Sequence, residues 1–169
     1  RGRQHRRPRT RGADLARADL GRVNLTDADL SGANLTRTDF RGAKLWGTNL
    51  TRADLSCADF EGADLSEANL TQADLGRTKF RGANLSDARL IRAKFSHTDL
   101  SYANLSRADM SESSLEWTIF TNVDLSKIKG LDTIRHYGPS AIDIETAYRS
   151  LGNIPKIFLR GTGVPDNLV

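Results

Sequence analysis

The chain of 169 residues is long enough for one domain with a small appendage, and its composition excludes several classes of protein. It has no run approaching the roughly 18 apolar residues of a membrane span, and no apolar stretch typical of a secretory signal follows its basic start. A single cysteine excludes a disulfide framework and suits a reducing compartment, so we expect a cytoplasmic protein without a membrane partner.

Charge and repetition divide the chain into residues 1–12, 13–127 and 128–169. Residues 1–12 hold six Arg and no acid, whereas residues 13–125 hold 13 Lys and Arg against 17 Asp and Glu. A basic segment of this kind is a solvated tail, a contact for phosphates, or a contact for the acidic face of another copy. No aromatic side chain stands among these arginines to stack on bases, so we expect no nucleic-acid partner.

A five-residue repeat starts at Ala13 and continues without insertion to Lys127, which gives 23 blocks. The first position is Ala, Thr, Val or Ser, the second is mostly Asp or Asn, and the third is always Leu, Phe or Met. Neither ordinary element fits this period. Five residues rotate by about 500° in an α-helix, and an odd period in a flat strand sends successive Leu to opposite faces. The chain must therefore bend once per block.

An extended chain alternates its side chains, so the first and third positions of a block point inward and the second points outward. The fourth and fifth positions, rich in Ser, Thr, Gly and Arg, turn the corner. If four blocks close one coil, the fold is all-β, a right-handed, four-sided parallel β-helix. Residues 20 apart then stack, which predicts a core column of Leu20, Phe40, Phe60, Phe80, Leu100 and Phe120. A charge at the inward Leu65 should be highly destabilising, whereas Glu67, at a corner, should be replaceable.

The tandem pattern of Ala, then Asp or Asn, then Leu resembles the pentapeptide-repeat family over residues 13–127. The resemblance implies the same right-handed quadrilateral β-helix, and it implies no catalysis and no cofactor.

The repeat fades after Lys127, and residues 128–169 are predicted to form a small helical cap. The sequence predicts one helix over residues 140–152, capped by Ser140 and ended by Gly152. The apolar stripe expected to dock this helix consists of Ile144, Ala147, Tyr148 and Leu151. A second helix is predicted over residues 153–161, with Pro155 in its first turn and Gly161 past its end. Residues 164–169 are predicted to begin a third element.

Residues 138–169 resemble the connector of bacterial proteins that join pentapeptide repeats to a Toll/interleukin-receptor (TIR) domain. The matching features are Gly138-Pro139-Ser140, Tyr148-Arg149-Ser150, Ile154-Pro155, Phe158-Leu159-Arg160-Gly161 and Gly163-Val164-Pro165-Asp166. The resemblance implies a bacterial protein in which a TIR domain follows the connector. It assigns no catalytic residue to the present sequence.

Few residues suggest a catalytic or metal-binding site. Cys57 is predicted at an exposed corner, without the histidine or helix N-terminus that would activate a thiol. His5, His97 and His136 do not have the spacing of metal ligands. The second-position aspartates are interpreted as a solvated face with pairing between coils, because Lys and Arg interrupt each column.

Two groups of residues are candidates for self-association or docking. The first is a basic strip in which one corner adjoins two further arginines: Arg17, Arg37 and Arg77, with Arg41 and Arg81. Its alternatives are contact with an acidic face of a second copy and pairing with neighbouring Asp. The second group is Trp117 and Ile119, which are apolar at outward positions and are predicted to receive the C-terminal helices.

The sequence favours a non-catalytic scaffold that self-associates, end to end or side by side, and displays a downstream effector domain. An alternative is a DNA-mimicking, topoisomerase-binding protein, as some pentapeptide-repeat proteins are. That role requires a strongly acidic surface, and the nearly balanced charge of residues 13–125 does not favour it.

Overall fold

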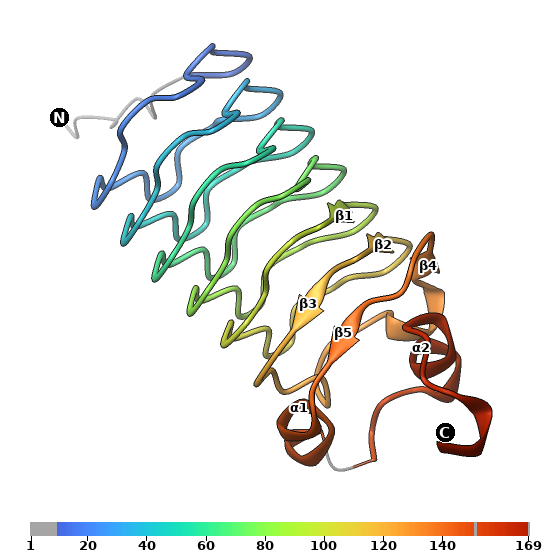
Figure 1. Ribbon diagram of the computed structural model, residues 1–169. Coiled ribbons are helices and arrows are strands. Elements are labelled where there is room, and N and C mark those ends of the chain that lie inside the picture. Colours follow the sequence, from blue (N-terminus) through green and yellow to red (C-terminus); the bar gives the residue numbers. More distant parts are fainter. Residues whose placement is uncertain (1–9, 151, 169) are drawn as a thin grey trace, which may run out of the picture.

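The computed structural model describes residues 10–150 and 152–168 and shows a rod of stacked coils with short helices at one end (Figure 1). Most of the rod has only single-residue bridges, so few segments qualify as strands. The elements are β1 (Lys94–Ser96), β2 (Ser114–Glu116), β3 (Ile119–Phe120), η1 (Leu131–Thr133), β4 (Arg135–His136), β5 (Ala141–Ile142), α1 (Ile144–Arg149), α2 (Lys156–Gly161) and η2 (Asp166–Leu168).

Parallel bridges between successive coils hold the rod together. From Asp14↔Asn34 to Asp109↔Lys129, each isolated bridge joins residues 20 apart, which confirms that four blocks form one coil. Each bridge is a pair of backbone hydrogen bonds. The third-position amide of Leu15 donates to Asn34 O at 2.8 Å, and Asn34 N donates back to Ala13 O at 2.9 Å.

The corners have a left-handed backbone at the fifth position. Seventeen non-glycine residues there have positive φ, among them Arg17 at 61° and Cys57 at 62°. The conformation is held in place because the fifth-position amide, such as that of Arg17, donates to the fourth-position carbonyl of the next coil, Thr36, at 2.9 Å. The fifth side chain therefore points away from the rod whatever its identity.

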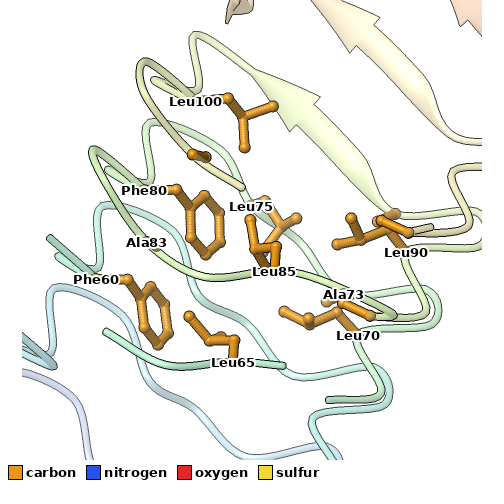
Figure 2. Close-up of a cluster of buried hydrophobic side chains, with 14 of the residues drawn as sticks. Phe60, Leu65, Leu70, Ala73, Leu75, Phe80, Ala83, Leu85, Leu90 and Leu100 are labelled. Carbon is orange, nitrogen blue, oxygen red and sulfur yellow. The ribbon is translucent and has the colours of Figure 1, made fainter. Parts of the chain in front are cut away.

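The interior is a closed column of first- and third-position side chains. Five members of the predicted column are fully buried: Phe40, Phe60, Phe80, Leu100 and Phe120. Figure 2 shows Phe60, Phe80 and Leu100 one above another in the tube. The rings of Phe40 and Phe60 stack at 4.6 Å, and those of Phe60 and Phe80 at 5.1 Å. Leu20, in the first coil, is only partly buried and packs against this core.

Inward threonines add hydrogen bonds to the core. Thr78 Oγ1 donates to Leu55 O at 2.9 Å, and Thr98 Oγ1 donates to Leu75 O at 2.7 Å. A buried hydroxyl needs such a partner. Threonine thus replaces alanine at the first position without leaving a polar group unpaired.

The ladder continues beyond residue 127, where the repeat fades. Lys129 still bridges Asp109, β4 pairs with β2, and β5 pairs with β3. The offset grows from 20 residues to 21 at Ser114↔Arg135 and to 22 at Ile119↔Ala141. One extra residue therefore lies between Lys129 and Arg135, where η1 is, and a second lies between His136 and Ala141, while the coil continues.

The first C-terminal helix differs from the prediction. Ala141 and Ile142 form β5, because Ala141 N donates to Thr118 O at 2.8 Å, so α1 begins only at Ile144. Its N-cap is Asp143 and not Ser140, and Asp143 Oδ1 accepts a hydrogen bond from Thr146 N at 2.8 Å.

The predicted apolar stripe does not dock. Ile144 is 80% exposed and Tyr148 is 74% exposed, and Ala147 is also exposed. Leu151, the fourth member, lies outside the described residues. The buried face of α1 is polar instead and consists of Thr146 and Ser150.

These polar side chains bond to backbone groups of the last coil. Thr146 Oγ1 accepts a hydrogen bond from Val123 N at 3.1 Å and donates to Phe120 O. Ser150 Oγ accepts from Leu125 N at 3.0 Å. By the pattern of the repeat, the Leu125 amide would donate to a further coil and the Val123 amide to the carbonyl three residues earlier. Both find side-chain acceptors in α1 and its C-cap instead.

The second helix packs on the end of the core through one aromatic residue. Phe158 is fully buried, and its ring lies edge-on to Phe120 at 6.0 Å and to His136 at 5.3 Å. Gly161 is the last residue of α2 rather than the residue after it. A Cβ at this position would come within 2.2 Å of the His136 ring, so the close approach requires glycine.

Candidate interaction surfaces

One corner of the rod displays cations in a row, and we call Arg17, Arg37 and Arg77 the basic corner. All three occupy the fifth position, have positive φ and are exposed. Among the residues that the structure describes, their side chains form no hydrogen bond or ion pair. The row is interrupted by Cys57, which is also exposed.

The two other arginines of the predicted strip lie at the next corner and are engaged. The Arg41 guanidinium donates to both carboxylate oxygens of Asp39, with its Nε 3.0 Å from each. This side-chain hydrogen bond is the main reason that the pKa of Asp39 falls to about 2. Arg81 lies over the Tyr102 ring, 4.7 Å from its centroid, in a cation–π contact. The predicted strip therefore separates into three unpaired and two paired cations.

The aspartates and asparagines of the second position support the turns. In most blocks the side-chain oxygen accepts the amide two residues on, as in Gly21 N to Asp19 Oδ1 at 3.1 Å. Some also pair between coils, as Lys79 Nζ does with Asp59 at 3.6 Å. The first role was not predicted from the sequence, although Asp or Asn two residues before a turn is a known signal for it.

Trp117 and Ile119 contact the segment before the helices. Trp117 N donates to Pro139 O at 2.9 Å, and Ile119 pairs with Ala141. Their side chains stay 53% and 38% exposed. The helices instead contact the rod through Thr146, Ser150 and Phe158.

The histidines lie in different surroundings. His5 lies outside the described residues, and His97 Nδ1 is 3.1 Å from Ser96 Oγ. Both ring nitrogens of His136 are buried and have no hydrogen-bond partner among the described residues, and burial lowers its pKa. Residues 10–150 and 152–168 contain no group of three His, Cys, Asp or Glu arranged to hold a metal ion.

A family comparison agrees with this architecture. The family model described as pentapeptide repeats (8 copies) matches residues 11–42, 33–72, 58–96 and 88–126. The chain belongs to the pentapeptide-repeat family. Proteins of this family fold as right-handed quadrilateral β-helices, which confirms that part of the predicted fold class.

Several solved pentapeptide-repeat structures are similar to the chain. One, from the thylakoid lumen of Arabidopsis thaliana, is 32% identical over 63% of this chain and 71% of its own, with a TM-score of 0.48. HetL, involved in heterocyst differentiation regulation in Nostoc sp. strain PCC 7120, is 34% identical over 71% of this chain and 67% of its own, with a TM-score of 0.42.

A third similar structure is QnrB1, a plasmid-mediated fluoroquinolone resistance protein. It is 23% identical over 73% of this chain and 70% of its own, with a TM-score of 0.34. No curated protein sequence matches this pentapeptide-repeat chain. Within its described residues, no helix has the length and apolar character needed to span a membrane.

Proposed function

We propose that this pentapeptide-repeat chain is a non-catalytic scaffold that associates with copies of itself and holds an effector domain at its C-terminal end. The observation that carries the proposal is the basic corner. Three exposed guanidinium groups stand in line on a rigid rod without an acid partner among the described residues, which suits an acidic surface on another molecule. Since the interior is filled with side chains, the residues available to bind another molecule lie on the outside of the rod.

We further propose that residues 128–168 act as a cap that ends the solenoid. The support is the set of backbone amides of Asn122, Val123 and Leu125, which donate to side chains of Asp143, Thr146 and Ser150. Open coil ends otherwise offer unpaired strand edges to other chains. A capped end disfavours stacking of a second rod there and leaves the sides of the rod for association.

The proposed effector is a TIR domain that follows the connector in a bacterial, cytoplasmic protein. The support is the resemblance of residues 138–169 to such connectors and the single cysteine. Holding several effector domains together raises their local concentration without any new contact between them.

Duplex mimicry is the weaker alternative. A DNA mimic presents a continuous acidic surface, whereas an exposed row of arginines, unpaired within the described residues, runs along this rod. The likeness to QnrB1 concerns the fold alone.

Sedimentation velocity over a wide concentration range tests the scaffold proposal. We expect species larger than the monomer at high concentration and low ionic strength, and dissociation on added salt, because exposed charge pairs are screened. A strict monomer under all these conditions would rule the proposal out.

A further inference from the structure

The corner diagonally opposite the basic corner carries acids at the same fifth position. Two blocks separate opposite corners of a four-block coil, so this corner contains Asp27, Glu67 and Asp87, which we call the acidic corner. Gly47 occupies the remaining step of the first four coils, and Arg107 and Lys127 continue the corner in the last two. Over the first four coils the two corners therefore present opposite charge on opposite sides of one rod, with the same axial spacing between their steps.

The order of the charges along the two corners indicates how two rods could align. Arginines occupy the first, second and fourth coils of the basic corner, and acids occupy the first, third and fourth coils of the acidic corner. When one row is reversed, all three of its charged steps fall opposite charged steps of the other row. When the two rows run parallel, an arginine meets an acid at no more than two steps in any register. Two antiparallel rods therefore bring together Arg17 with Asp87, Arg37 with Glu67, and Arg77 with Asp27.

The remaining step of this alignment also fits. Cys57, the gap in the basic row, falls opposite Gly47, the gap in the acidic row. Beside Gly47 stands Trp46, which is 41% exposed. The small Cys57 step leaves room for this indole between Arg37 and Arg77, where guanidinium groups favour an aromatic face.

The charged groups on both corners are available for such pairing. Arg17, Arg37 and Arg77 have no internal partner in the described part of the chain, and neither Asp27 nor Glu67 forms an ion pair there. Asp87 holds Arg107 of its own corner at 2.5 Å, and a carboxylate can accept a second guanidinium on its remaining lone pairs.

We propose that a second copy of this chain packs side by side and antiparallel, its acidic corner on the basic corner of the first. The inference rests on the proposed self-association and names its surface. Because the two corners lie on opposite sides of a rod, the contact is heterologous and does not close on itself. Copies add in a row, alternating in direction, so that their C-terminal ends emerge alternately at the two edges of the row.

Charge reversal at the central pair tests the contact in the whole chain. We expect Arg37→Glu and Glu67→Arg each to weaken association roughly tenfold in sedimentation velocity, because an attraction becomes a repulsion. The double variant Arg37→Glu/Glu67→Arg should restore most of the loss. Arg22→Glu, at another corner but in the same backbone conformation, is the matched control and should leave association unchanged.

Cross-linking tests the register. In the variant Gly47→Cys, a short bis-maleimide should join the thiol introduced at position 47 to Cys57 of the next copy and give a ladder of covalent oligomers. The new side chain meets only the flexible Asp27 carboxylate, so the fold should tolerate it. Gly62→Cys, with a similar φ but at a third corner, should give no ladder.

The outcomes separate the contact from the scaffold role. If the wild-type chain associates but the corner variants associate equally well, the proposed contact is wrong and the scaffold proposal stands. If the single variants weaken association and the double variant does not recover it, or if Gly62→Cys cross-links as well as Gly47→Cys, the antiparallel register is wrong. A monomeric wild type overturns both proposals.

Discussion

At the scale of single residues, the fifth position of each block decides the shape of the rod. It adopts positive φ in glycine and non-glycine residues alike, including Arg17, Glu67 and Trp117. The sequence predicted a corner there, but Arg, Glu or Trp gives no sign of a left-handed backbone, which these residues rarely adopt. The hydrogen bonds to the next coil impose the conformation, and those exist only once the coils are stacked.

Substitution of Gly62 tests this backbone strain without a steric clash, since a Cβ at Gly62 meets nothing within 4 Å. We expect Gly62→Val to lower the free energy of unfolding by about 1–2 kcal/mol, because a β-branched residue resists φ near +64°. Gly62→Asn should lower it much less, because Asn tolerates this region. Urea denaturation measures both. Equal losses for Val and Asn would contradict a backbone origin.

At the scale of elements, the first C-terminal helix shows where prediction from the apolar pattern fails. The helical periodicity was present in residues 144–148, but the rule that the apolar face docks assumes an apolar surface to receive it. The last coil instead offers amides that need acceptors, so Thr146 and Ser150 face the rod and Ile144 and Tyr148 face solvent. Repeat boundaries in the sequence do not reveal this requirement.

Thr146 is the residue on which this docking most depends. Thr146→Val keeps the shape but removes the partner of Val123 N and of Phe120 O, both buried. We expect a loss of about 1–3 kcal/mol in the free energy of unfolding. Thr146→Ser retains the hydroxyl and should recover most of that loss. Thermal unfolding of the two variants provides the comparison, and a Val variant as stable as wild type would disprove the role.

At the scale of the whole molecule, stability is nearly one-dimensional because each coil contacts only its neighbours. The period of 20, the inward Leu and Phe, and the exposed corner at Cys57 were all predictable, since each follows from alternation and repetition alone. The separation of Arg41 and Arg81 from the basic corner was not, because pairing with Asp39 and Tyr102 depends on side-chain geometry.

A charge buried in the core at the middle of the rod tests whether stability is one-dimensional. We expect Leu65→Asp, which buries a carboxylate in a fully apolar column, to lower the free energy of unfolding by more than about 3 kcal/mol. Hydrogen exchange should show protection lost first around residues 45–85, and later toward the helices. Glu61→Gln, at an exposed corner of the same coil that is outside the proposed contact, should leave exchange unchanged. A uniform loss along the chain would argue against one-dimensional stability.

The bridge spacing of 20 residues also limits how such a chain can change in length. Loss or gain of one block would swing everything downstream through a quarter turn and point the C-terminal helices in a new direction. Loss of four blocks would shorten the shaft while keeping their heading. Deletions and duplications that preserve the azimuth of the C-terminal end should therefore come in multiples of twenty residues.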